Sequence, residues 1–182
     1  MSDNNNSILL LKAVSKAAWF HRTQRRKGSQ RIPYINHPIR VAEYLTNCGF
    51  SDLELLQAAI LHDVVEDTEY TLHEMESDFG EKVASIVAEV TDDMHLPSSR
   101  RKELQVISAQ GLSEEAARLK IADKTCNISD LLTYEISWSV NRKLAYVEWS
   151  ERVIDNIFKP DPCLLKKFRE QVKRAKIILG QS

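Results

Sequence analysis

The hydrophobic residues of this chain recur with the spacing of amphipathic helices along most of its length. Val83, Ile86, Val87 and Val90, for example, stand at positions i, i+3, i+4 and i+7, which places them on one helix face. The strict alternation of apolar and polar residues that marks a half-buried strand is missing nearly everywhere. Only five Gly and five Pro interrupt the helical pattern. The sequence therefore predicts an all-α protein.

Capping residues divide this pattern into separate helices. Residues 51–54 and 71–74 have the sequence of a capping box, in which the first side chain and the fourth residue bond each other's backbone. Ser113 is the expected N-cap of a long helix. We predict helices over residues 7–23, 37–45, 51–62, from 71 onward, 83–90, 101–110, 113–132, 139–158 and from 162 to about 179.

Length and composition favour one domain. The chain has 182 residues, of which 43% are hydrophobic and 28% charged, and it contains no repeat, low-complexity tract or linker. We expect a single domain over residues 1–182, with residues 1–6 as a flexible N-terminus. No apolar run approaches the roughly 20 residues of a membrane span, so no membrane partner is expected.

Charge and cysteine usage narrow the class of protein further. The net charge of −1 creates no global field for nucleic acid, so no nucleic-acid partner is expected. The N-terminus lacks the layout of a signal peptide. Three cysteines without a CxxC spacing are typical of reduced thiols. These features predict a cytoplasmic protein.

Four ionisable side chains stand close together at the end of an apolar helix. His62 and Asp63 follow the apolar residues 55–61, and Glu66 and Asp67 come three and four residues after Asp63. Such a group is costly near a core unless something compensates it. A divalent metal is the usual compensation, since it pairs with carboxylates and accepts neutral imidazole as a ligand.

Two further residues complete a candidate metal site. His37 stands at a helix start, and Asp123 lies on an apolar helix face. Adjacent residues of a helix point about 100° apart, so His62 and Asp63 converge on one ion only where the helix ends. A nitrogen and oxygen ligand set without thiolate indicates manganese, iron, magnesium or zinc. Periodicity alone leaves open that these are ordinary satisfied polar residues.

The remaining polar residues suggest an anionic substrate. Glu66 and Asp67 would orient or deprotonate a metal-bound water, with a solvated acidic turn as the alternative. A basic segment, residues 22–31, precedes His37 and would clamp phosphates, unless it is only an exposed loop. Asn127 shares a helix face with Asp123. Arg142, Tyr146 and Trp149 form a stripe on a later helix.

These residues resemble a known family. His37, the His62-Asp63 pair and Asp123 follow the pattern of the HD superfamily of metal-dependent phosphohydrolases. Residues 25–27, 33–38, 59–68, 79–80, 89–93 and 119–124, together with Asn127, look like the hydrolase domain of RelA/SpoT proteins. The likeness covers nearly the whole chain in order. It is strongest to the stand-alone small alarmone hydrolases, which include the metazoan SpoT homologue.

The resemblance implies both a reaction and a set of site residues. The fold would be a single HD-type helical domain, and the reaction would be Mn2+-dependent removal of the 3′-pyrophosphate from guanosine 3′,5′-bis(diphosphate) (ppGpp) or its pentaphosphate relative. The products would be GDP or GTP and pyrophosphate. By position, the implied metal ligands are His37, His62, Asp63 and Asp123; the implied catalytic pair is Glu66 and Asp67; and the implied substrate-binding residues are Arg26, Lys27, Asn127, Arg142 and Tyr146.

Three departures from the family pattern bear on substrate affinity and base selectivity rather than on the chemistry. Ser98, Met94 and Ser129 stand where close relatives often have basic residues. The sequence therefore leaves two alternatives open. One is a phosphohydrolase acting on another nucleotide such as NADPH, and the other is a non-catalytic nucleotide sensor.

Overall fold

The computed structural model describes residues 2–180, and within them it contains helices and no β-strand. The prediction of an all-α protein is therefore confirmed. The only extended pairing among these residues is an isolated antiparallel bridge between Arg25 and Pro33. The helices are α1 (Ser2–Phe20), α2 (Asn36–Thr46), α3 (Leu53–Leu61), α4 (Val64–Asp67), α5 (Leu72–Phe79), α6 (Glu81–Val90), α7 (Ser98–Ser108), the 3-10 turn η1 (Ala109–Gly111), α8 (Glu114–Thr133), α9 (Val140–Asp155) and α10 (Pro162–Gly180).

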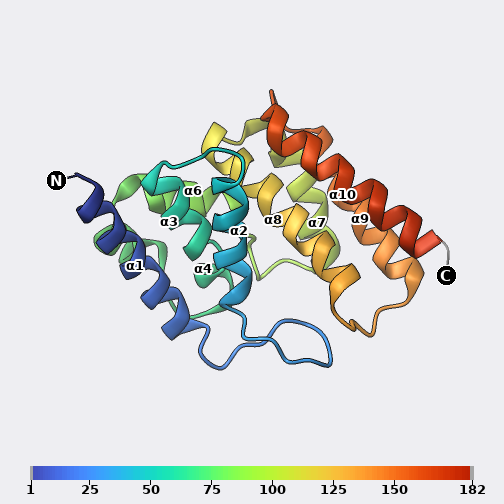
Figure 1. Cartoon of the computed structure of the whole chain (residues 1–182), viewed down its shortest axis with the longest axis horizontal. Helices are drawn as coiled ribbons and strands as arrows, with labels where there is room; N and C mark the ends of the chain where they lie inside the picture. Colours follow the sequence, from blue (N-terminus) through green and yellow to red (C-terminus); the bar gives the residue numbers. More distant parts are fainter. Residues whose placement is uncertain (1, 181–182) are drawn as a thin grey trace.

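Helix α8 forms the centre of the protein. It contacts α2, α3, α6, α9 and α10, and it crosses the middle of the molecule between α2 and α10 (Figure 1). Its apolar residues, including Leu119, Ile121 and Ile128, are fully buried. The middle of α8 is buried because neighbouring helices pack against it on several sides. Polar residues in the middle of α8, such as Asp123, are therefore carried toward the interior, whereas Glu114 and Thr133 at its ends remain exposed.

The first helix differs from the sequence prediction at both ends. It begins at Ser2 instead of Ser7, so residues 2–6, expected to be a flexible terminus, belong to a helix. Those residues include neither Pro nor Gly, and nothing in them ends a helix. The helix ends at Phe20 instead of Thr23, because the chain turns there: Gln24 N donates to His21 O at 3.0 Å. Met1 lies outside the described residues.

The capping predictions are confirmed at two of three helices. Thr71 and Glu74 form the expected capping box, and Ser113 accepts a hydrogen bond from Ala116 N. At α3 the cap is Asp52, one residue later than predicted, and its carboxylate accepts from Leu55 N at 2.9 Å. Ser51 and Asp52 are both good N-caps, so the sequence alone does not separate them.

Two loops lie side by side at one end of α8. The segment before α2 meets the segment between α8 and α9, where Ser29 Oγ donates to Glu135 Oε2 at 2.7 Å. Gly28 suits the turn at this approach, since its φ of +133° is a backbone conformation that residues with a side chain rarely adopt. The paired loops form the rim of the site described below.

None of the helices between residues 2 and 180 has the length and apolar character needed to span a membrane.

Candidate metal centre and active site

The helix that carries the His-Asp pair breaks at that pair. Helix α3 ends at Leu61 and the short α4 begins at Val64, so His62 and Asp63 form a turn between them. This break in the helix allows the side chains of two adjacent residues to point toward the same place. Helix α2 delivers His37 from its first turn, and α8 delivers Asp123 from its middle.

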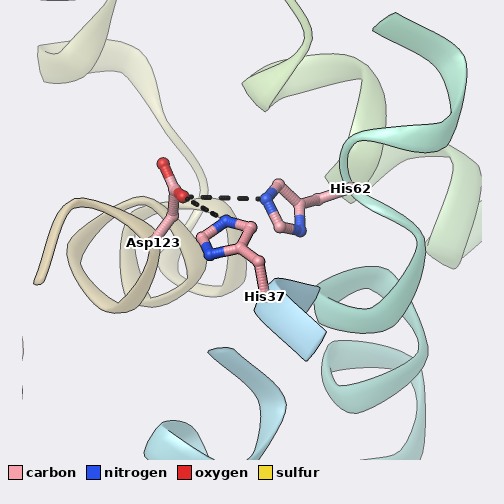
Figure 2. A group of neighbouring side chains, drawn as sticks. All are labelled: His37, His62 and Asp123. Carbon is pink, nitrogen blue, oxygen red and sulfur yellow. Dashed lines mark hydrogen bonds and ion pairs between the residues drawn. The ribbon is translucent and has the colours of Figure 1, made fainter. Parts of the chain in front are cut away.

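Three of the four predicted ligands, His37, His62 and Asp123, meet at one point (Figure 2), and Asp63 lies beside both imidazoles. His37 Nε2 lies 3.1 Å from Asp123 Oδ1 and 3.7 Å from Asp63 Oδ2. His62 Nε2 lies 3.1 Å from Asp63 Oδ2 and 3.7 Å from Asp123 Oδ1. Metal–ligand bonds of about 2.0–2.2 Å separate neighbouring ligand atoms by roughly 3.0–3.5 Å. The distances between neighbouring atoms are therefore close to those that one ion requires, and the ligand atoms of His37, His62 and Asp123 all lie within 4.8 Å of one another.

Neighbouring groups orient these ligands. His62 Nδ1 lies 2.8 Å from Ala59 O, so donation there leaves the Nε2 lone pair directed at the centre. His62 Nε2 is buried and makes no hydrogen bond of good geometry among the described residues. Tyr34 Oη donates to Asp63 Oδ2 at 2.7 Å, and Asn127 Nδ2 donates to Asp123 Oδ1 at 2.6 Å. An unsatisfied buried nitrogen beside two oriented carboxylates fits a bound cation.

The charges of the centre also favour a cation. Burial acts against it, yet pairing with His37 and His62 holds the pKa of Asp123 well below its usual value. Burial also acts against ionisation of Asp63, but the His62 charge lowers the pKa of that carboxyl well below its usual value. The pKa of His62 is raised despite burial because of the Asp63 charge, whereas burial lowers the pKa of His37. Two ionised carboxylates therefore share one buried centre, and positive charge is needed to balance them.

The two members of the acidic pair have different environments. Glu66 is half-buried and its Oε2 accepts from Asp92 N at 3.0 Å. Burial raises the pKa of Glu66 to about 7; the Asp92 N–H opposes this rise and the Asp63 charge adds to it. Asp67 is exposed, and its Oδ2 accepts from Gln24 Nε2 at 2.7 Å. Glu66 therefore has the protonation behaviour of a general base near neutral pH.

A cavity of about 340 Å³ opens beside this centre. His62, Asp63 and Asp123 line it, as do Glu66 and Asp67. His37 lies behind this wall and is 2% exposed. Of the residues predicted to bind substrate, four line the cavity: Arg26, Lys27, Asn127 and Tyr146. The structure thus brings three of the candidate metal ligands, the acidic pair and several cations to one space.

Arg142 is the exception among the predicted substrate-binding residues. It does not line the cavity; its guanidinium instead stacks on Trp138, 4.3 Å from the ring centroid. Trp138 does line the cavity, and Lys27 Nζ lies 5.3 Å from the same centroid. Arg142 therefore reaches the site through Trp138. Trp138 could not be predicted from sequence, because it lies in an irregular loop where periodicity carries no information.

Asp130 is a second residue that the sequence reasoning missed. It is 3% exposed and its Oδ2 accepts from Arg26 Nε at 3.1 Å and Arg26 Nη2 at 2.6 Å. Arg26 Nη2 also donates to Asn127 Oδ1, and Asn127 in turn donates to Asp123. A hydrogen-bonded chain thus joins Asp130 to the metal centre. The signal was present: Asp123, Asn127 and Asp130 are spaced i, i+4 and i+7 on α8.

The hydrogen bonds that Arg26 donates to Asp130 predict that Asp130 influences substrate binding through Arg26. Asp130→Asn and Arg26→Met should each raise KM roughly tenfold with little change in kcat, because one charge-assisted contact is worth about that factor. In the double variant the two effects should not add, since both remove the same contact. Steady-state kinetics on the three variants measure this.

Arg40→Met is the matched control. Arg40 Nη2 also donates to Asp130, on the other oxygen, but Arg40 does not line the cavity. Its KM should stay within about twofold of the wild type, because Asp130 keeps its hydrogen bonds to Arg26 and Arg40 itself does not touch the cavity. Additive effects of Asp130→Asn and Arg26→Met would show that Asp130 has a separate structural role.

Comparison with known proteins identifies the class. The model of the HD domain family matches residues 13–145, which is most of the chain. The residues that it spans include all four candidate ligands and the acidic pair. This chain therefore belongs to the HD domain family.

Its relatives define the group within that family. The chain is 49% identical to human guanosine-3′,5′-bis(diphosphate) 3′-pyrophosphohydrolase MESH1, over 81% of this chain and 84% of the relative. It is 40% identical to the Drosophila melanogaster MESH1 protein, over 83% and 86%. A solved structure of a metazoan SpoT orthologue, described as hydrolysing ppGpp, matches with a TM-score of 0.87 at 38% identity, over 91% and 94%. These relatives place the chain in the MESH1 group.

Proposed function

We propose that this protein hydrolyses guanosine 3′,5′-bis(diphosphate), and its pentaphosphate relative, at the 3′-pyrophosphate. The observation that carries the proposal is the meeting of a two-histidine, two-carboxylate centre, a base with a pKa of about 7 and a cationic wall in one cavity. The human relative that bears the name of this activity is 49% identical.

The chain's own residues supply most of the proposed reaction. Glu66 accepts a proton from the attacking water, and Asp67, held by Gln24, orients that water. The water oxygen forms a bond to the phosphorus attached to O3′, and the P–O3′ bond breaks. O3′ leaves with the electron pair and is protonated, which gives GDP or GTP and pyrophosphate. Arg26 and Lys27 bind phosphoryl oxygens and offset their charge.

We infer that the resident cation is Mn2+, held by His37, His62, Asp63 and Asp123. Two imidazoles and two carboxylates form a mixed nitrogen and oxygen set that suits manganese. A divalent cation at this centre supplies Lewis acidity to phosphoryl transfer.

The protein is further inferred to act in the cytoplasm. The cysteines Cys48, Cys126 and Cys163 are free, as is usual for a reducing compartment.

A substrate panel tests the proposal. Purified protein is incubated with Mn2+ and with ppGpp, NADPH or GMP as substrate. The assay is repeated with Mg2+, with Zn2+ and with a chelator. We expect turnover of ppGpp that depends on Mn2+ and exceeds turnover of the other two. Faster release of phosphate from NADPH would favour a different nucleotide phosphohydrolase. Tight binding of ppGpp without any turnover would favour a nucleotide sensor.

A further inference from the structure

Lys124 is a buried lysine that the proposed reaction does not yet use. It follows Asp123 on α8, is 4% exposed and lines the cavity. Within residues 2–180 it donates no hydrogen bond and joins no ion pair, so its three N–H donors have no assigned acceptor. A lysine whose stem is buried and whose ammonium opens onto a cavity can present its N–H donors to a ligand there.

An aromatic ring holds this ammonium in place. Lys124 Nζ lies 4.0 Å from the centroid of Trp149, a cation–π distance. The ring is itself fixed, because Trp149 Nε1 donates to Lys102 O at 2.9 Å. The face of an aromatic ring attracts a cation but offers no lone pair to accept a conventional hydrogen bond from its N–H groups. The donors of Lys124 therefore remain free for a ligand in the cavity.

Lys120 shows what a purely structural lysine looks like at the same wall. It lies one turn earlier on α8, is 7% exposed and also lines the cavity. Its Nζ donates to Val90 O at 3.0 Å, so its charge and one donor are used by the fold. Lys124 has no such contact, and burial alone therefore does not explain it.

Lys124 lies at the reacting end of the cavity, because it follows Asp123 on α8 and lines the same cavity as Asp123 and Glu66. Asp123 belongs to the candidate metal centre and Glu66 is the proposed base. The group that the proposed reaction brings to this end of the cavity is the 3′-pyrophosphate, whose oxygens accept hydrogen bonds and carry negative charge.

We propose that Lys124 Nζ binds a phosphoryl oxygen of the substrate's 3′-pyrophosphate and holds the pyrophosphate product before its release. This rests on the proposed function, because it assumes that a pyrophosphate group occupies the cavity. Lys124 on α8 and two cations of the loop before α2, Arg26 and Lys27, then surround the same anionic group.

Pyrophosphate binding tests the proposal without requiring turnover. Inorganic pyrophosphate is titrated calorimetrically into wild type, Lys124→Met and Lys102→Met, with equal Mn2+ in both solutions. Lys124→Met keeps an unbranched apolar side chain of similar size but removes the ammonium and its charge. Its dissociation constant should rise at least about tenfold, the effect of losing a charge-assisted contact.

Lys102→Met is the matched control. Lys102 Nζ lies 5.3 Å from the centroid of the same Trp149 ring, but Lys102 is exposed and does not line the cavity. Its variant should bind pyrophosphate within about twofold of the wild type, because the lost charge faces solvent. Lys124→Gln provides a second neutral variant where methionine disturbs folding, and circular dichroism checks each protein.

The outcomes separate this inference from the proposed function. Wild type that hydrolyses ppGpp while Lys124→Met binds pyrophosphate within twofold of it would overturn the role of Lys124 and leave the function standing. Wild type inert towards ppGpp would overturn the function itself. Stronger Mn2+ binding by Lys124→Met with unchanged pyrophosphate binding would show that Lys124 only balances the acidic centre.

Discussion

Glu66→Gln is expected to lower kcat by about 10²–10⁴-fold, the usual contribution of a general base. The amide is nearly isosteric with the carboxylate but cannot accept the proton of the attacking water. Its oxygen can still accept from Asp92 N, so the local fold should be kept. Metal content, measured by elemental analysis, should equal that of wild type. Loss of metal in this variant would mean that Glu66 is a ligand.

The same variant should be more stable than wild type at high pH in the metal-free protein. The pKa of Glu66 is raised to about 7 in the fold, so the stability that its protonated form contributes is present at low pH and lost as the pH rises through 7. Glutamine is not subject to this loss. The gain in the free energy of unfolding of Glu66→Gln over wild type should be absent near pH 4 and should grow as the pH rises to 7. Above pH 7 it should be at most about 3 kcal/mol.

Glu69→Gln is the control for both measurements. Glu69 lies three residues further on and is exposed. Its thermal stability and kcat should remain close to wild type at every pH. Equal pH-dependent gains in the two variants would indicate a general charge effect instead of burial of Glu66.

Asp63→Ala is expected to abolish both metal binding and turnover. Asp63 Oδ2 lies within 3.7 Å of both imidazoles, and without it the centre loses one of two balancing charges. Turnover of ppGpp should fall to the level seen with a chelator, and Mn2+ should no longer raise the melting temperature. The measurements are calorimetric Mn2+ titration and thermal melts.

Glu69→Ala on the same segment should bind Mn2+ as wild type does, since its exposed carboxylate lies outside the cavity lining. An Asp63→Ala protein that still binds Mn2+ with wild-type affinity and hydrolyses ppGpp would remove Asp63 from the ligand set.

Local sequence rules predicted the elements that depend on neighbouring residues. Thr71 and Ser113 cap their helices as expected, because a cap involves only the next three residues. The break at His62-Asp63 followed from the geometry of adjacent helical residues. The start of α1 was predicted five residues too late, because a polar segment without helix breakers looks the same in a helix and in a flexible end.

Contacts between distant segments were less predictable. Arg142 lies on the helix stripe that the sequence indicated, yet its guanidinium stacks on Trp138 instead of lining the cavity. The positions of Trp138 and Lys27 depend on how two loops pack, and no local spacing encodes that packing. Asp130 could have been found from its spacing to Asp123, but its partner Arg26 is 104 residues away.

The identity of the products released from ppGpp tests the central claim most directly. Wild-type protein is incubated with ppGpp and Mn2+, and the mixture is followed by phosphorus NMR. The account predicts GDP and pyrophosphate in equal amounts, with no orthophosphate formed first. Release of orthophosphate, or of pyrophosphate from the 5′ end to leave a 3′-phosphorylated product, would contradict it.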